Sequence, residues 1–441
     1  MYVASKRFTR NQIPTYESYL ISPTNFNWFL FVLALEMQPS SQQNMRIAIV
    51  GAARTPVGAL GGALSSLTAP QLGSIAIKEA LKQAKVNPKD VDEVYFGNVL
   101  QAGVGQAPAR QAALLAGLPP SVCCTTVNKV CASGMKSVSL AASSILNGDA
   151  EIVVAGGMES MSNAPFLLPE LRFGKKYGDS KALDSMARDG LRDAYSNKPM
   201  GDCGELCAKE DNVPRAVQDA YAARSFERAV KAQATGKFKA EIAPVSIKVR
   251  GETKIIDKDE IKPTSLETLQ KLRPVFDPPV SVTAGNASTI NDGASALVLM
   301  SEEHAKKLSI PILAIIRGWA DAETDPDHFT IAPSLAIPKA LKKAKVNPSE
   351  VDFYEINEAF SVVAIANAKR LQLDENKVNV YGGAVSLGHP LGSSGSRILV
   401  TLLNVLKQES GRIGVAGICN GGGGASAIVV EKVSQNASSK L

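Results

Sequence analysis

Two kinds of hydrophobic pattern alternate along the chain from about residue 45 onward. Unbroken apolar runs, such as IAIVGA at 47–52 and EIVVAGG at 151–157, are typical of strands buried on both faces, as in parallel sheets. The segment 216–234 instead spaces its apolar residues at helical intervals, which predicts an amphipathic helix. Strands of this kind interspersed with helices predict a layered α/β fold.

One combination of helix, turn and strand occurs twice. The segments 80–99 and 340–359 each contain an apolar helix stripe, an Asn-Pro stop and a short strand. Further on, 131–134 and 392–395 each precede a helix-like segment and then a strand-like run. The chain is therefore predicted to hold two copies of one α/β unit, because a repeated pattern of this length sets the architecture.

The segment between the two copies is more polar and reads as an insertion over the core, where such segments commonly shape the substrate pocket. The first residues lack the α/β pattern, and we expect a disordered or targeting-like extension there. The predicted division is an extension (1–44), an N-terminal half (45–161) to which the segment 292–310 returns, an inserted loop domain (162–291), a C-terminal half (311–432) and a tail (433–441).

The composition narrows the class of protein. Apolar residues make up 45% of the 441 residues and charged residues 20%, as in ordinary globular proteins. The net charge of +6 is spread without a basic run, so we expect no nucleic-acid partner. The 6 Cys lack the spacing of a disulfide framework, which favours free thiols, and with 3 His we expect no metal site.

Cys131 is the first candidate for chemistry. It follows the strand-like run 123–130 and stands directly before a predicted helix. A helix N-terminus favours negative charge and lowers the pKa of a thiol, which suits a nucleophile. A lone Cys is otherwise most often a buried structural residue, and that alternative stays open on this motif alone.

His389 lies in a Gly-rich segment, YGGAVSLGHPLGSSGS. In the duplicated frame it stands just ahead of the position equivalent to Cys131, so the two copies are expected to bring both residues to one edge of the core. A Cys beside a positioned His is the arrangement of an activated thiol nucleophile. The alternative is an exposed loop His.

Cys419 and Asn357 complete the candidate set. Cys419 follows a buried-type strand and precedes a Gly run whose backbone N–H groups suit an oxyanion; the run lacks the dinucleotide-binding fingerprint. Asn357 ends a strand, where its amide suits a water or a carbonyl oxygen. Its neighbour Glu358 is alternatively a helix-cap residue.

These segments resemble the thiolase family, and within it the eukaryotic biosynthetic type, the acetoacetyl-CoA thiolases. The resemblance runs from about residue 45 to 432, and the motifs ARTPVG at 53–58 and GGMESMSNAP at 156–165 add to it. It implies the thiolase fold: two duplicated βαβαβαββ halves in an αβαβα layering, with an inserted loop domain. It also implies an acetyl-CoA C-acetyltransferase that condenses two acetyl-CoA reversibly to acetoacetyl-CoA and CoA.

The resemblance also implies a role for each candidate. Cys131 would carry the acetyl group, His389 would take the proton from Cys131, and Cys419 would remove the α-proton of the second acetyl-CoA. One oxyanion hole would be His389 with a water held by Asn357, and the other the backbone N–H groups of Cys131 and Gly421.

By the same resemblance, five residues would contact the CoA thioester: Phe276, Ala284, Ser288, Met200 and Phe360. Both Phe residues are alternatively ordinary core residues. Some relatives bind potassium through a Tyr where this chain has Phe226, so we expect no potassium; CoA thioesters are substrates, and no cofactor is expected. Relatives often have His before Met-Gly, where this chain has Pro199.

Two alternatives remain from the sequence. One is a 3-ketoacyl-CoA thiolase of peroxisomal β-oxidation that takes longer chains, and the other is a non-catalytic thiolase-like protein that binds acyl-CoA or lipid. The terminal Ser439-Lys440-Leu441 is typical of a peroxisomal address, which predicts an import receptor as partner and a peroxisomal location; the cytoplasm is the alternative. The family suggests a homodimer or homotetramer, and the biosynthetic type suggests the mevalonate pathway.

Overall fold

A mixed β-sheet organises the structure, a computed structural model that describes residues 45–276 and 279–433. The strand order is β12-β13-β14-β11-β1-β10-β5-β3-β4, and β2 pairs with β10. The strands of this sheet are β1 (Ile47–Arg54), β2 (Gly58–Ala59), β3 (Glu93–Gly97), β4 (Cys123–Val127), β5 (Ile152–Ser160), β10 (Asn291–Ser301), β11 (Ala314–Glu323), β12 (Phe353–Ile356), β13 (Ile413–Asn420) and β14 (Gly424–Lys432).

The two halves of the chain meet at β1 and β11, which are joined by only three residue pairs. Strands β3, β4 and β5 pair in parallel, as do β12 and β13, whereas the pairs around β1, β10, β11 and β14 are antiparallel. The expectation that the unbroken apolar runs are parallel strands is therefore wrong for β1. Its residues are all buried because helices cover both faces of the sheet, not because of strand direction.

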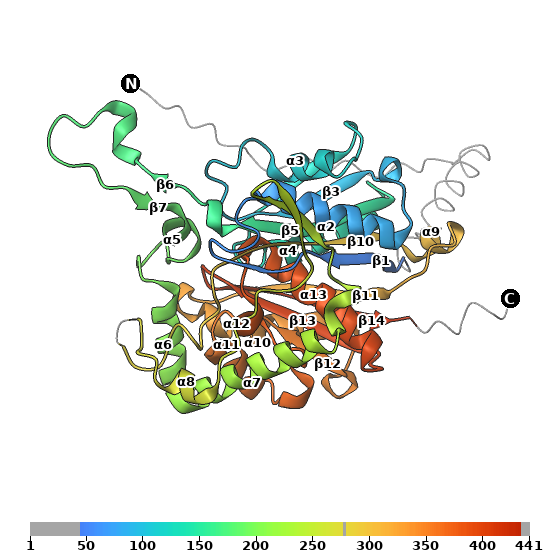
Figure 1. Cartoon of the computed structure of the whole chain (residues 1–441). Helices are drawn as coiled ribbons and strands as arrows, with labels where there is room; N and C mark the ends of the chain where they lie inside the picture. Colours follow the sequence, from blue (N-terminus) through green and yellow to red (C-terminus); the bar gives the residue numbers. More distant parts are fainter. Residues whose placement is uncertain (1–44, 277–278, 434–441) are drawn as a thin grey trace, which may run out of the picture. The chain divides into compact units, whose positions relative to one another are not determined.

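Helices lie on both faces and between the halves. Figure 1 shows α4 and α13 in the middle, with α2 and α3 on the side of the first half and α10 and α11 on the side of the second. One apolar cluster combines residues of α4, α13 and strands of both halves, and two others lie under α2 and under α10. The helices of the two halves are α2 (Ala69–Ala84), α3 (Pro108–Leu115), α4 (Ser133–Asn147), α9 (Glu302–Lys307), α10 (Pro333–Ala344), α11 (Ser361–Arg370), α12 (Ala384–Leu387) and α13 (Leu391–Gln408).

The duplicated segments adopt the same local structure. Helix α2 ends at Lys85, in the left-handed region at φ 56°, and α10 ends at Lys345, at φ 54°. Each cap N–H bonds back to a carbonyl of the last turn, and an Asn-Pro pair then prevents the helix from continuing. The strands β3 and β12 begin the same number of residues after α2 and α10, respectively. The loops that follow these two strands therefore lie at equivalent ends of the sheet.

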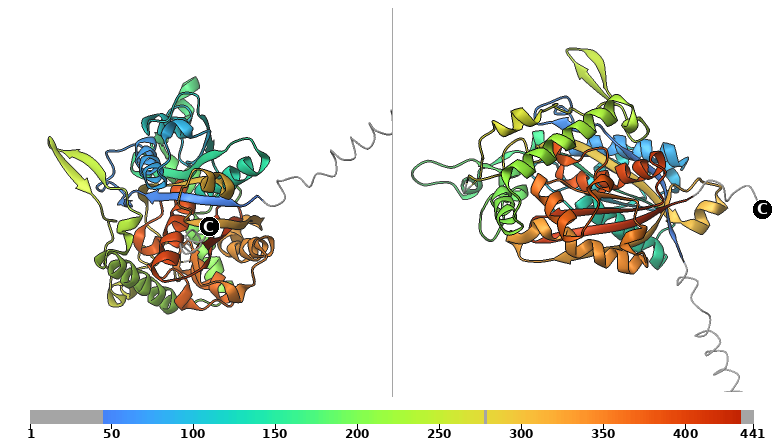
Figure 2. Two further views of the ribbon diagram at one scale, coloured as in Figure 1. Left: turned by 90° about the vertical axis from the view of Figure 1, so that its right-hand side faces the viewer. Right: turned by 90° about the horizontal axis from the view of Figure 1, so that it is seen from below.

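The inserted segment lies between β5 and β10 in the sequence. Figure 2 shows its two-stranded β8–β9 ribbon projecting from the rest in both views. The described residues from Met45 onward form one compact unit, so the insert belongs to the same body as the two halves. Its elements are β6 (Phe166–Leu167), β7 (Leu183–Asp184), α5 (Ser185–Gly190), α6 (Met200–Glu210), α7 (Arg215–Ala234), β8 (Val245–Val249), β9 (Glu252–Ile256) and α8 (Leu266–Gln270).

Arg54, at the end of β1, attaches the insert to the core. Its side chain is fully buried, at 0% exposure. Its Nε donates to Glu241 Oε1 at 2.6 Å, and its Nη1 and Nη2 donate to the two carboxylate oxygens of Asp259 at 2.7 and 2.9 Å. The carboxylates of Glu241 and Asp259, both in the insert, thus share one buried guanidinium. Without it, these buried carboxylates would lose their cationic partner.

Replacing Arg54 with Met is expected to lower the free energy of unfolding by about 3–5 kcal/mol, because two buried carboxylates lose their partner. Chemical denaturation measures the change. Lys82→Ala is the matched control, since Lys82 is 77% exposed and pairs only with Glu79, and such surface pairs contribute at most about 1 kcal/mol. An Arg54→Met midpoint equal to that of the control would contradict this account.

Two expectations concern segments outside the described residues. The extension at 1–44 and the Ser439-Lys440-Leu441 address both fall there, and both stay predictions. Within the described residues, no helix has the length and apolar character needed to cross a membrane.

Candidate active site

Cys131 lies on the short turn between β4 and α4, two residues before the helix begins at Ser133. The residue before it, Val130, has φ 45°, a conformation that is strained for a β-branched side chain. The turn is held by hydrogen bonds: Val130 N donates to Asn128 Oδ1 at 3.0 Å, and Lys129 N donates to Ser133 Oγ at 2.9 Å. Local strain of this kind is typical of a nucleophile presented on a sharp turn.

The Cys131 thiol is only 8% exposed, and burial raises its pKa to about 12. The backbone N–H groups of Gly421 and of Cys131 itself bond to the sulfur and lower the pKa, but by less than burial raises it. The sequence-based expectation of a lowered pKa is therefore wrong. The helix N-terminus is present, but residues from both halves exclude water from the sulfur.

Cys419 comes from the other half, near the end of β13, and is fully buried. Burial raises its pKa well above the ordinary value, and the nearby Cys131 raises it further. The chain then turns through Gly422 and Gly423, at φ 85° and 91°, into β14. The two thiols and the N–H of Gly421 thus meet at one place, as the sequence predicted.

His389 stands in the connection before α13. Its N–H donates to Asn291 Oδ1 at 3.0 Å, and a Cβ at the preceding Gly388, which has φ 104°, would lie 2.3 Å from the Asn291 side chain. His389 Nδ1 is 2.6 Å from Ser394 Oγ, whose hydroxyl donates to Pro390 O at 2.9 Å. Ser394 Oγ is therefore an acceptor for Nδ1–H, which leaves Nε2 unprotonated.

The imidazole of His389 is suited to accept a proton at Nε2. Burial and, to a smaller extent, the charge of Arg397 lower its pKa to about 3, so the ring is neutral at pH 7. Nε2 is buried and has no hydrogen-bond partner among the described residues. An unprotonated, unpartnered ring nitrogen is the state that a general base needs before it takes up a proton.

Asn357 follows β12, and its N–H donates to Gly417 O of β13 at 3.0 Å. Its side-chain Nδ2 and Oδ1 are both buried without a partner among the described residues. Buried polar atoms are normally paired, so orphaned atoms at Asn357 and His389 indicate a place for a water or for a substrate oxygen.

Glu358 is not a helix cap. Its carboxylate accepts hydrogen bonds from Tyr221 Oη at 2.9 Å, Ser225 Oγ at 2.8 Å and Val385 N at 3.0 Å. Asn379 Nδ2 adds a bond of 2.9 Å. Glu358 therefore ties the insert helix α7 to the segment before His389 and corrects the cap alternative.

Three of the five predicted CoA contacts, Phe276, Phe360 and Met200, pack in or against the apolar cluster of Cys419. Phe276 and Phe360 pack edge to face, with ring centroids 6.1 Å apart, and Phe360 shares an apolar cluster with Cys419. A Cβ at Gly421 would lie 3.4 Å from Met200 Sδ, which puts Met200 over the predicted oxyanion site. Ser288 Oγ donates to Ala359 O at 2.8 Å, and Ala284 is exposed. Their contact with CoA stays a prediction.

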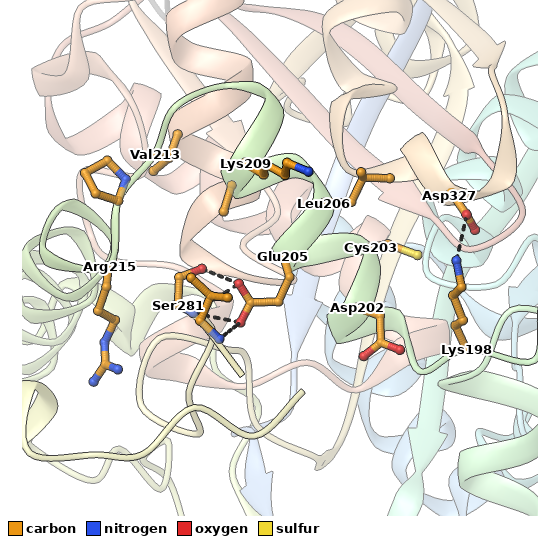
Figure 3. A pocket seen from close by; sticks show the side chains of 13 residues that line it. Lys198, Asp202, Cys203, Glu205, Leu206, Lys209, Val213, Arg215, Ser281 and Asp327 are labelled. Atoms are coloured by element: carbon orange, nitrogen blue, oxygen red, sulfur yellow. Dashed lines mark hydrogen bonds and ion pairs between the residues drawn. The ribbon is translucent and has the colours of Figure 1, made fainter. Parts of the chain in front are cut away.

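A cavity of ≈ 700 Å³ opens beside α6 but contains none of the predicted site residues. Figure 3 shows Glu205 pointing to Ser281 and Lys198 paired with Asp327 along its wall. Cys203 lines this cavity and also packs in the apolar cluster of Cys419. The cavity thus adjoins the wall of the site, but the chemistry belongs to the cluster around Cys131.

The Cys203 and Cys207 pair on α6 is buried, as expected for packing residues. Among the described residues, no group of three or more His, Cys, Asp or Glu side chains is arranged to hold a metal ion.

Comparison with known proteins gives concordant matches. The models "Thiolase, N-terminal domain" and "Thiolase, C-terminal domain" match residues 47–303 and 310–432. An acetyl-CoA acetyltransferase of Schizosaccharomyces pombe is 58% identical over 88% of this chain and 100% of its own length. Acetyl-CoA acetyltransferase 1 of Arabidopsis thaliana is 57% identical over 91% and 98%, and a cytosolic acetyl-CoA acetyltransferase of Gibberella zeae is 53% identical over 88% and 98%.

Sequence patterns missed the residues that orient these groups. Ser394, which binds the imidazole, and Asn291, which accepts from the backbone N–H of His389, are small polar residues without a motif of their own. Glu159 was visible only as one letter of the segment GGMESMSNAP, and nothing in its spacing indicated that it is buried beside Cys131.

Proposed function

The chain belongs to the thiolase family, and we propose that it condenses two molecules of acetyl-CoA to acetoacetyl-CoA and CoA through an acetyl thioester on Cys131. The enzyme is an acyltransferase, and the relatives that match most of its length carry the name acetyl-CoA acetyltransferase. The observation that carries the residue assignment is the meeting of the Cys131 and Cys419 thiols with the N–H of Gly421.

In the first half-reaction, Cys131 Sγ attacks the carbonyl carbon of acetyl-CoA. Because burial keeps this group a thiol, its proton must leave during the attack, and His389 Nε2 is the neutral base that accepts it. The backbone N–H groups of Cys131 and Gly421 face the sulfur and stabilise the oxyanion that forms on the carbonyl oxygen. CoA leaves as a thiol after taking the proton from His389.

In the second half-reaction, Cys419 acts as the base. Because burial keeps Cys419 a thiol, its proton first passes to His389 Nε2, and the resulting thiolate removes a proton from the α-carbon of the second acetyl-CoA. His389 Nε2–H and a water on Asn357 then donate to the enolate oxygen. The carbanion attacks the acetyl carbon on Cys131, and the bond to sulfur breaks. The Cys131 thiolate then takes the proton from the Cys419 thiol, and His389 returns its proton to Cys419. Acetoacetyl-CoA then leaves, and every step is reversible.

The test is an assay of thiolysis and condensation over acyl-chain length. We expect thiolysis of acetoacetyl-CoA, condensation of acetyl-CoA, and much slower thiolysis of long-chain 3-ketoacyl-CoA. A preference for long chains would instead establish the 3-ketoacyl-CoA thiolase alternative. Tight binding of acyl-CoA with no turnover in either direction would establish the non-catalytic alternative.

Assembly, cofactor and pathway belong to the same proposal. We expect a homodimer or homotetramer without a cofactor, since thioester chemistry requires only the thiols, the imidazole and the oxyanion donors. We also propose a biosynthetic role, as in the mevalonate pathway, which requires the reversible reaction to run in the condensing direction.

A further inference from the structure

Glu159 is a buried carboxylate at the end of β5 that joins three segments of the chain. It is fully buried, at 0% exposure. Its Oε1 accepts hydrogen bonds from Asn98 Nδ2 at 2.7 Å and Leu100 N at 3.1 Å. Its Oε2 accepts from Val99 N at 3.0 Å and from Gly392 N at 2.8 Å. The last of these bonds comes from the other half of the chain.

Gly392 is in the first turn of α13, three residues after His389. A Cβ at Gly392 would lie 2.6 Å from Met158 O and 2.9 Å from both Asn98 Cα and Glu159 Oε2. The start of α13 therefore packs with its backbone directly against the backbone of the first half. Gly392 has no side chain that could fix the position of the helix there. Glu159 supplies the polar contact that fixes its depth and direction.

We propose that Glu159 is a positioning residue for the reaction, which holds the start of α13, and with it His389, against the turn that carries Cys131. The proposal rests on the proposed function, because it assigns the orientation of the same nucleophile and base. It differs from a purely structural role, since Glu159 also places a buried negative charge beside the nucleophile.

The charges near Cys131 define what this placement does. After burial, the charge of Glu159 is what raises the pKa of Cys131, and Cys419 from β13 is a second titratable group that interacts with Cys131. Burial, with a smaller contribution from the charge of Asp292 of β10, raises the pKa of Glu159 itself to about 7, although its backbone hydrogen bonds oppose this shift. Above that pH the carboxylate disfavours a free Cys131 thiolate, so transfer of the proton to a well-placed His389 becomes necessary.

The isosteric change Glu159→Gln separates these effects from simple packing. A glutamine replaces one acceptor oxygen by an NH₂ donor, which would face the N–H groups of Leu100 or Gly392. The start of α13 must then shift, and a displacement of about 1 Å at a reacting group costs roughly 100-fold in rate. Removal of the charge should also lower the pKa of Cys131.

The experiment uses the full-length enzyme. Steady-state thiolysis of acetoacetyl-CoA gives kcat and KM, and alkylation of Cys131 by iodoacetamide, followed by mass spectrometry, gives its reactivity against pH. For Glu159→Gln we expect kcat to fall about 100-fold with an unchanged KM, and the alkylation profile to move to lower pH. Glu159→Asp keeps the charge on a shorter arm, so its kcat should fall while its profile stays in place.

Glu241→Gln is the matched control. Glu241 is also buried and also binds α13, through Thr401 and Asn404, but it lies in the Arg54 network and away from the thiols. We expect it to lower stability without moving the alkylation profile. The proposal is overturned if the kcat of Glu159→Gln only follows its folded fraction, as in the control, or if its alkylation profile coincides with that of the wild type.

If the Glu159→Gln variant does not fold, the Glu159→Asp variant replaces it in the test. A wild-type kcat for Glu159→Asp then overturns the proposal. Alkylation does not require turnover. A wild-type enzyme that fails to cleave acetoacetyl-CoA would therefore count against the proposed function, while the alkylation profiles would still report on the placement of the charge.

Discussion

Replacement of Cys131 by serine is expected to lower the rate of thiolysis and of condensation by at least about 10⁴-fold, because a nucleophile acts as a unit with its base. A serine hydroxyl is a far weaker acid than a thiol, and burial disfavours its ionised form further. The acetyl group would in addition be held as an ester, which leaves much more slowly than a thioester. Substrate binding should survive, since the backbone N–H groups of Cys131 and Gly421 are unchanged.

Rate assays and acetyl labelling check this expectation. Incubation with labelled acetyl-CoA should rapidly leave an acetyl group on the wild-type peptide that contains Cys131, whereas the variant should acquire the label at least about 10⁴-fold more slowly. Cys123→Ser is the matched control, because Cys123 is an exposed thiol at the sheet edge, on the strand that leads to Cys131. Near-normal turnover by Cys131→Ser, with the control equally active, would remove Cys131 from the mechanism.

The repeated pattern is what made the fold and the meeting of Cys131 with Cys419 predictable. Helix stripes, Asn-Pro stops and apolar runs depend on neighbouring residues alone, so they can be recognised in the sequence. The same helix pattern and the same Asn-Pro stop are found at α2 and at α10. Because both copies must present their loops at equivalent ends, residues far apart in the chain were expected together. Cys131 contributes to the raised pKa of Cys419, so the two thiols lie near each other, and the duplication predicts this proximity.

The electrostatics of the site was not predictable in the same way. The pKa of Cys131 was expected to fall from its place before α4, but burial by residues of both halves raises it. Burial depends on the whole packing around a group and has no local signature. Glu358 and Glu159 show the same limit, since their partners Tyr221 and Gly392 lie 137 and 233 positions away.

Replacement of Cys419 by alanine is expected to separate the two half-reactions. Cys131 keeps its base and its backbone donors, so acetyl-CoA should still acetylate it and release one equivalent of CoA. The second step loses the group that removes the α-proton, and condensation should fall by about 10³-fold to 10⁴-fold, as for loss of a positioned general base. The acetyl-enzyme should therefore accumulate.

Rapid mixing with acetyl-CoA measures this directly, as a burst of free CoA followed by very slow formation of acetoacetyl-CoA. Cys207→Ala is the matched control, because Cys207 packs in the same apolar cluster as Cys419 but carries no assigned proton transfer. A Cys419→Ala enzyme that also fails to take up the acetyl group would contradict the division of labour between the thiols. In that case the two sulfurs would act as one unit from the first step.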